Sequence, residues 1–136
     1  MTEIDRERRL SAAIAELEEF CKIFRFKLMW EYADSDPCAY TTLNVVQPGS
    51  KCCVVLRERA RRDYRGIGYS SKYAIAERLL SKIRRGVTLF WQWEESRPTE
   101  RGKLTIRYTR LYRVPKFTSV AALKIQLAAE GSEFAS

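Results

Sequence analysis

The chain contains no histidine, and this absence limits the chemistry open to it. Without imidazole there can be no Ser–His–Asp triad, no histidine general base and no zinc site that needs a histidine ligand. Its four cysteines include no Cys-x-x-Cys pair, which disfavours a four-cysteine zinc site. We interpret them as free thiols that pack as small apolar residues in a reducing compartment.

Other catalytic groups are also scarce. Glu16, Glu18 and Glu19 share a predicted helix and are typical of a solubilising surface, while Glu94 and Glu95 would point to opposite sides of a strand. The GxxxxGK[ST] loop that binds nucleotide phosphates is missing from the sequence. We therefore expect no enzyme activity, no cofactor and no metal site.

Long hydrophobic runs are missing too, and glycine and proline are few, at 6 and 4 residues. With 46% hydrophobic residues among 136, we expect one domain with a single core over residues 1–130. No membrane span and no signal peptide is recognisable, so we expect a cytoplasmic protein without membrane contact. Gly131–Ser136 would be encoded by three concatenated restriction sites, as is typical of a cloning scar, and we assign this segment no role in function.

Hydrophobic periodicity predicts an α+β fold in the order helix, three strands, helix, two strands, helix, with the helices on one face of an antiparallel sheet. Ser70 or Ser71 would cap the second helix and Gly86 would end it. The helices are expected over residues 3–24, 70–85 and 118–130. The strands are expected over residues 26–33, 40–46, 52–59, 87–95 and 103–114, with a polar loop over 96–102.

What the sequence does have is a concentration of positive charge between Lys51 and Arg85. The chain has 25 Lys and Arg against 17 Asp and Glu, a net charge of +8. This segment alone contains 11 basic and three acidic residues, which is the same excess. A concentrated positive charge of this kind favours binding to a polyanion, most commonly nucleic acid. Residues 1–36 have nine acidic and six basic side chains, so we do not expect their acidic face to contact phosphate.

The predicted helix over residues 70–85 is amphipathic. Its apolar stripe would pack on the sheet, and its basic face would either bind phosphate or be an ordinary solvated surface. The apolar stripe consists of Tyr73, Ala76, Leu79, Leu80 and Ile83. The opposite face gathers Ser71, Arg78, Lys82 and Arg85.

The segment Gly66–Ala74, GIGYSSKYA, resembles the G-x-G-x-S-K-K-x-A stretch that opens the second helix of double-stranded RNA-binding domains. The element order over residues 3–85 is similar to that family's order as well. The resemblance implies that cations at this helix start contact phosphates across the major groove of duplex RNA. By position Lys72 is one of them, whereas Ser71 and Ile75 replace the other two lysines. The family's histidine between its first two strands has no counterpart here.

A second resemblance covers roughly the last 80 residues. Their order of strand, helix, two strands and helix is similar to that of the tombusvirus RNA-silencing suppressors, which clamp short RNA duplexes as dimers. This resemblance implies a viral or regulatory protein that sequesters duplex RNA as a homodimer. Under either function considered below, the last predicted helix, with Val120, Ile125 and Leu127, could supply a dimer contact.

The last two predicted strands alternate between aromatic and basic side chains. We expect Leu89, Trp91 and Trp93 to face the core, although aromatic residues beside arginines also stack on bases. The opposite face, with Lys103 and Arg107, is the better candidate for contact with a ligand.

The sequence therefore predicts a protein that binds double-stranded RNA by shape and phosphate contacts, with little sequence preference. An alternative remains, in which the basic face docks an acidic partner inside a ribonucleoprotein or viral assembly. The candidate RNA-binding residues are Arg57, Arg59, Arg61, Arg62, Arg65, Lys72, Arg78, Lys82, Arg85, Lys103 and Arg107.

Overall fold

A computed structural model describes residues 2–33, 40–49, 53–61 and 69–135 of the chain. Within these residues, three helices and five strands follow one another in the order α-β-β-β-α-β-β-α, which confirms the α+β class and the predicted element order. The helices are α1 (Glu3–Ile23), α2 (Tyr69–Arg84) and α3 (Val120–Ala129). The strands are β1 (Lys27–Ala33), β2 (Tyr40–Gln47), β3 (Cys53–Arg61), β4 (Val87–Thr99) and β5 (Gly102–Val114).

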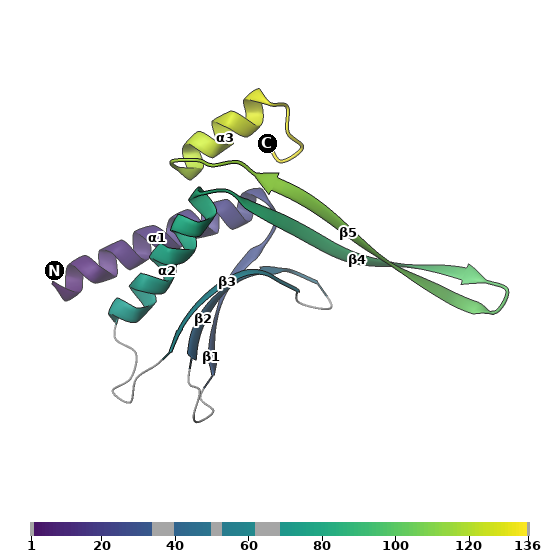
Figure 1. The fold of residues 1–136 in the computed structure, drawn as a ribbon, viewed down its shortest axis with the longest axis horizontal. Coiled ribbons are helices and arrows are strands. Elements are labelled where there is room, and N and C mark those ends of the chain that lie inside the picture. The colour runs from purple at the N-terminus through teal and green to yellow at the C-terminus, as the bar shows by residue number, and fades with distance from the viewer. Residues whose placement is uncertain (1, 34–39, 50–52, 62–68, 136) are drawn as a thin grey trace.

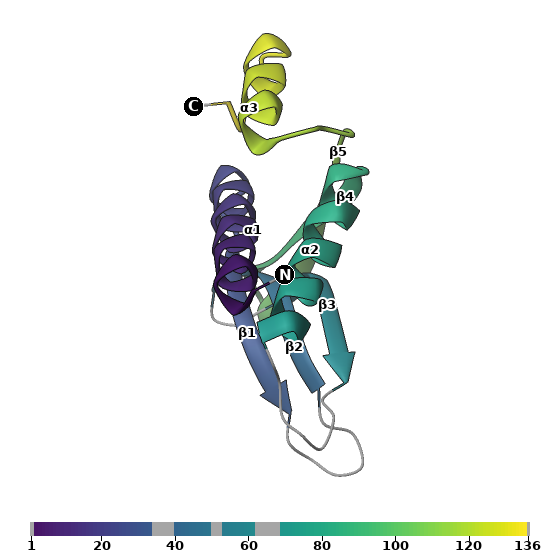
Figure 2. The same cartoon turned by 90° about the vertical axis from the view of Figure 1, so that its left-hand side faces the viewer.

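The strands are divided between two antiparallel sheets. One has the order β1-β2-β3, and the other is the β4–β5 hairpin (Figure 1). Helices α1 and α2 lie side by side over one face of the three-stranded sheet (Figure 2). Leu43 and Val45 of the central strand point into the core between this sheet and the two helices, and both are fully buried. The other face of the same sheet carries no helix among the elements in the described part of the chain.

Helix α1 begins with a reciprocal capping box. The Thr2 hydroxyl accepts a hydrogen bond from the Asp5 backbone N–H, and the Asp5 carboxylate accepts one from the Thr2 backbone. The Thr2 hydroxyl also donates a hydrogen bond to the Asp5 carboxylate at 2.7 Å, and this bond, followed by the one from the Thr2 backbone N–H, lowers the pKa of Asp5 below its usual value. The helix ends at Phe24, and Arg25 takes a positive φ of 62°, a conformation that directs the chain into β1. Residues Ala13, Leu17, Phe20 and Cys21 form its buried face.

Helix α2 packs an apolar stripe against α1 and the sheet. The stripe consists of Ile75, Ala76, Leu79, Leu80 and Ile83, all buried. The helix begins at Tyr69, so Ser70 and Ser71 lie inside it, and the prediction that one of them is its N-cap is wrong. Gly86 follows the helix with a φ of +95°, and a Cβ there would lie 3.2 Å from the Val114 carbonyl oxygen. The chain can therefore turn into β4 at this point only with a glycine.

The Glu16 carboxylate joins all three helices. Its Oε2 accepts a hydrogen bond from the Arg84 guanidinium of α2 at 2.5 Å, and its Oε1 accepts one from the Val120 backbone N–H of α3 at 3.3 Å. An acidic side chain at a helix amino terminus is also favoured by the helix dipole. The interpretation of this acidic cluster as plain solubilising surface is therefore wrong for Glu16. Glu19 pairs with Lys124 of α3 at 2.8 Å, and this bond lowers the pKa of Glu19.

The β4–β5 hairpin is longer than the sequence predicts. Pairing continues from Val87↔Val114 to Thr99↔Gly102, so residues 96–99 belong to β4 and the expected polar loop over 96–102 is wrong. Pro98 is compatible with β4 because each strand of a two-stranded ribbon is an edge strand, where a missing N–H is tolerated. Only the base of the hairpin is in the core. Leu89 is fully buried, Trp91 is half-buried and Trp93 is 41% exposed, so the core prediction fails at Trp93.

The carboxyl-terminal segment packs against the base of the hairpin. The Phe134 ring lies 5.3 Å from Trp91, 5.0 Å from Phe24 and 4.9 Å from Tyr112, measured between ring centroids. The neighbouring Glu133 forms an ion pair with Arg110 of β5. Whatever its origin, the segment of residues 131–135 is thus part of the packed structure.

Helix α3 does not offer the dimer surface that its sequence suggests. Val120, Leu123 and Leu127 are buried against the rest of the protein. Of the three residues expected to make a dimer contact, only Ile125 is exposed, at 72%. A dimer contact through this helix would therefore rest on Ile125 and the small exposed side chains of Ala121, Ala128 and Ala129.

Candidate nucleic-acid interface

Three predicted RNA-binding residues line up on β3. Arg57, Arg59 and Arg61 occupy alternate positions and are all exposed. They share the sheet face away from α1 and α2, because the intervening Glu58 contacts α2. Alternate residues of a strand lie about 6.6 Å apart, so the three side chains form an evenly spaced row. The guanidinium of Arg59 lies over the Tyr40 ring, 4.6 Å from its centroid.

Helix α2 adds cations to the other side of the same strand. Arg78 lies 3.5 Å from Glu58 and donates a hydrogen bond to the backbone carbonyl of Arg59 at 3.3 Å. This places the Arg78 side chain at the outer edge of β3. Lys82 follows four residues later on the same helix face, and Arg85 comes directly after the end of α2; both are exposed.

Four predicted residues thus lie on or beside the outer edge of β3, and Lys82 and Arg85 extend this group along α2 to its end. In the sheet as described, β3 pairs with β2 alone, so its other edge is open. We call this surface the basic edge. It consists of Arg57, Arg59, Arg61, Arg78, Lys82 and Arg85.

Lys72 lies elsewhere. Its ammonium group is 5.4 Å from the Trp30 ring centroid and 5.2 Å from that of Tyr32, both on β1, so it makes cation–π contacts there. Ile75, which stands where the resemblance has another lysine, is fully buried. This turn of α2 therefore adds no cation to the basic edge. The Trp30 ring is half-buried and packs against the core.

The remaining candidates are not brought to the basic edge. Lys103 and Arg107 lie on the β4–β5 hairpin, where Arg107 pairs with Glu94 at 3.1 Å. Arg107 also borders an open groove of about 770 Å³ between the hairpin and the end of β2, with Gln47 and Cys53 on its other side. Arg62 and Arg65 are outside the described residues.

Two polar residues of the central strand were missed by the sequence analysis. Thr42 and Asn44 pair with Arg59 and Arg57 respectively, on the face of the sheet that no described helix covers, and both side chains are buried. The Asn44 amide donates a hydrogen bond to Glu31 of β1 at 3.0 Å. The sequence pattern that could have identified them is the alternation of polar residues with Leu43 and Val45 in β2, which predicts a strand with one polar and one apolar face. Glu31 limits the positive charge of this face on the β1 side.

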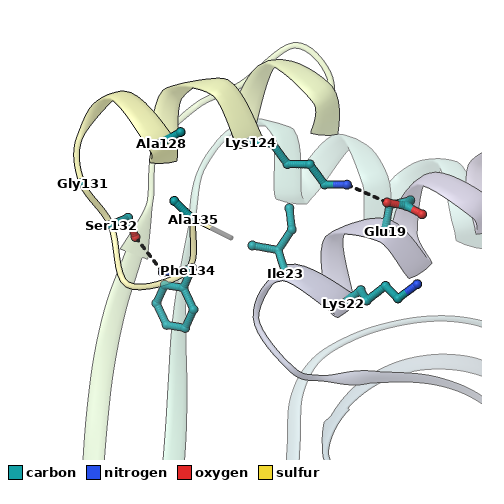
Figure 3. A pocket seen from close by; sticks show the side chains of 9 residues that line it. All are labelled: Glu19, Lys22, Ile23, Lys124, Ala128, Gly131, Ser132, Phe134 and Ala135. Carbon is teal, nitrogen blue, oxygen red and sulfur yellow. Dashed lines mark hydrogen bonds and ion pairs between the residues drawn. The ribbon is translucent and has the colours of Figure 1, made fainter.

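A second cavity, of about 510 Å³, lies between the end of α1, α3 and the carboxyl-terminal segment (Figure 3). The Glu19–Lys124 ion pair crosses it and neutralises both groups, while Ile23 and Phe134 supply apolar walls. Among the side chains that the structure describes, no three His, Cys, Asp or Glu are grouped as metal ligands would be. In the same part of the chain, each helix is too short or too polar to span a bilayer.

Comparison of the chain with known protein families, with curated proteins and with solved structures finds no match. The two RNA-related resemblances of the sequence therefore stay predictions.

Proposed function

We propose that this protein binds duplex RNA through the basic edge, by contacts to phosphates that carry little sequence information. The observation that supports the proposal is a group of six exposed cations on β3, on α2 and directly after α2, of which the three on β3 and Arg78 lie on or beside one open strand edge. Five of them are arginines, whose planar guanidinium groups bind phosphate oxygens through two parallel hydrogen bonds.

The row on β3 fits an extended phosphate backbone better than a small anion. Arg57, Arg59 and Arg61 are evenly spaced along a straight strand, so each can contact a different phosphate. Duplex RNA has a deep, narrow major groove that side chains do not read, and it is recognised largely through its shape and backbone. A surface with regular cations and no concave base pocket is suited to that kind of recognition.

The experiment is an equilibrium binding titration with an RNA duplex of roughly 20 base pairs, longer than the span of a double-stranded RNA-binding module. A DNA duplex and a single-stranded RNA of the same sequence are the controls. If all six cations contact phosphate, the affinity for duplex RNA falls about a thousandfold between about 50 and 200 mM salt. No binding to any of the three nucleic acids would overturn the proposal.

Two double variants test whether RNA contacts the basic edge. Replacing Arg57 and Arg59 together by Gln removes two phosphate contacts and lowers the slope of log affinity against log salt by about two. The matched control replaces Arg101 and Lys103 by Gln, which removes the same charge from the tip of the hairpin. An equal loss in both variants would mean that net charge, and not the basic edge, determines binding.

One observation favours a second candidate, the docking of an acidic protein segment. In the described sheet, the outer edge of β3 has no strand partner, and cations of β3 and α2 flank it. An extended acidic peptide could add a strand there. Arg78 already donates to the Arg59 carbonyl on this edge, so the peptide would have to displace that contact. Binding of a glutamate-rich peptide, with no binding of RNA, would establish this alternative.

A further inference from the structure

The outer half of the β4–β5 hairpin projects from the molecule as an isolated ribbon (Figure 1). We call the part from Trp93 to Tyr108 the arm. Every residue from Glu94 to Thr105 is exposed. A two-stranded ribbon is at best marginally stable alone in water, and three strands or a covered face are normally needed. The arm therefore has the properties of an element whose partner is a second molecule.

The two faces of the arm differ in character. Trp93, Leu104, Ile106 and Tyr108 share one face by the strand register, and the Trp93 and Tyr108 rings stack with centroids 5.3 Å apart. Trp93 is 41% exposed and Leu104 52%. The opposite face is polar, with Ser96, Lys103, Thr105 and the Glu94–Arg107 ion pair. Such alternation is typical of a strand with one covered face. Nothing in the described part of the chain covers the apolar face of the arm.

Two charged residues complete this apolar face. Glu95 pairs with Ile106 across the hairpin and accepts a hydrogen bond from the Trp93 indole N–H at 3.4 Å. We call each cross-strand pair of residues a rung. The next rung on the same face is Arg97 with Leu104, and Arg97 lies 3.8 Å from Glu95. The face thus contains one acid, one base and four apolar side chains.

We propose that the apolar face of the arm is covered by the same face of a second copy of this chain, packed antiparallel. A two-fold axis that crosses the arm between these two rungs would put Glu95 opposite Arg97 of the second copy, and Ile106 opposite its Leu104. The same operation lays the bulky Trp93–Tyr108 rung over the small Thr99–Gly102 rung. Charge, apolar contact and size are then complementary on both sides of the axis.

This complementarity favours a second copy over other occupants. A two-fold contact uses one patch on both molecules, so the patch must be complementary to itself, and this one is. A phosphate backbone would need an excess of positive charge, whereas Glu95 and Arg97 cancel. The basic edge belongs to β3 and α2, away from the arm, so the dimer leaves it accessible (Figure 1).

Sedimentation equilibrium of the full chain without RNA tests the proposal, and its outcome is independent of RNA binding. We expect a mass of twice 15.9 kDa at high concentration, with dissociation on dilution. Leu104→Asp should abolish the dimer, because it puts a charge in the apolar contact. Thr105→Asp, the same change at the neighbouring residue on the polar face, should leave the dimer intact. A monomeric wild type, or equal effects of the two substitutions, would overturn the proposal.

A charge exchange tests the register. Glu95→Arg or Arg97→Glu alone places like charges opposite each other on both sides of the axis, and each should weaken the dimer about tenfold or more. An equimolar mixture of the two variants should form mixed dimers with the wild-type affinity, because each cation then meets a carboxylate of the other chain. Each variant by itself has two like charges on this face, so recovery on mixing can come only from contact between the two chains. Variants that remain separate on mixing would overturn the antiparallel register.

Discussion

The side-chain amide of Gln47 forms two hydrogen bonds with the backbone of Gln92. Its Nε2 donates to the Gln92 carbonyl at 2.7 Å, and its Oε1 accepts from the Gln92 N–H at 2.8 Å. Gln47 is the last residue of β2, and Gln92 lies in the middle of β4. One side chain therefore acts as a strand partner for β4 and connects the hairpin to the three-stranded sheet.

Gln47→Ala should detach the hairpin from this sheet. Two backbone groups of β4 lose their partner, and we expect a loss of about 1–2 kcal/mol in the free energy of unfolding. Gln47→Glu is the matched control, because it keeps an acceptor for the Gln92 N–H and removes only the donor. Urea denaturation should rank the wild type above both variants, and an unchanged midpoint for Gln47→Ala would contradict this role.

Glu16 should contribute to stability through its charge. Glu16→Ala removes the partner of the Arg84 guanidinium and of the Val120 N–H, and we expect a loss of about 1–3 kcal/mol. Glu16→Gln keeps the size and one acceptor, so its loss should be smaller. Thermal unfolding monitored by circular dichroism measures both. Glu18→Ala, on the exposed side of the same helix, should change the stability by less than about 0.5 kcal/mol.

The packing of Phe134 predicts that the carboxyl-terminal segment stabilises the fold. Phe134→Ala removes an aromatic ring from contact with three others, and we expect a loss of about 1–3 kcal/mol. Glu133→Gln removes only the exposed ion pair with Arg110 and should cost less than about 1 kcal/mol. A chain that ends at Glu130 should unfold at lower urea concentration than the full chain. Equal midpoints would show that the segment is dispensable.

Burial of Cys21 predicts a loss of stability in alkali. Burial, together with the nearby charge of Glu18, raises the pKa of the Cys21 thiol from 9.0 to about 12. The unfolded thiol loses its proton above pH 9, while the folded thiol keeps it until about pH 12. The stability from the neutral thiol is thus fully present below pH 9 and is lost as pH rises from 9 to 12, by about 1.4 kcal/mol per pH unit.

Urea denaturation between pH 8 and pH 11, with Cys21→Ala for comparison, isolates this effect from other groups that titrate in the same range. The wild type should lose stability more steeply with pH than Cys21→Ala. Parallel curves for the two proteins would mean that the Cys21 thiol ionises equally easily in the folded and unfolded states.

The local parts of the fold could be predicted from the sequence. Apolar residues three and four apart define the buried faces of α1 and α2, and alternation defines β2 and β5. These patterns depend only on the geometry of the helix and the strand, so the α+β class and the element order follow from them. Their limits are visible at α2, where the predicted stripe included Tyr73 but not Ile75, which is fully buried.

Tertiary contacts determined the rest. The same alternation continues from Leu89 to Trp93, yet the first is buried and the second is exposed, because only the base of the hairpin has protein above it. In the sequence, charge identifies the candidate basic residues, and for Lys72 the family resemblance adds to it. The packing of α2 against β3 decided that Arg78 joins Arg57 and Arg59, whereas Lys72 is directed to the rings of β1.

The sequence by itself determined the elements, their order and the excess of positive charge, since each depends on residue type and local spacing. For the described residues, the tertiary structure alone decided that five strands form two sheets, that cations of β3 and α2 meet at one strand edge, and that one hairpin face is left uncovered. The physical reason is that pairing and burial depend on which distant surfaces meet, and no local pattern specifies the partner.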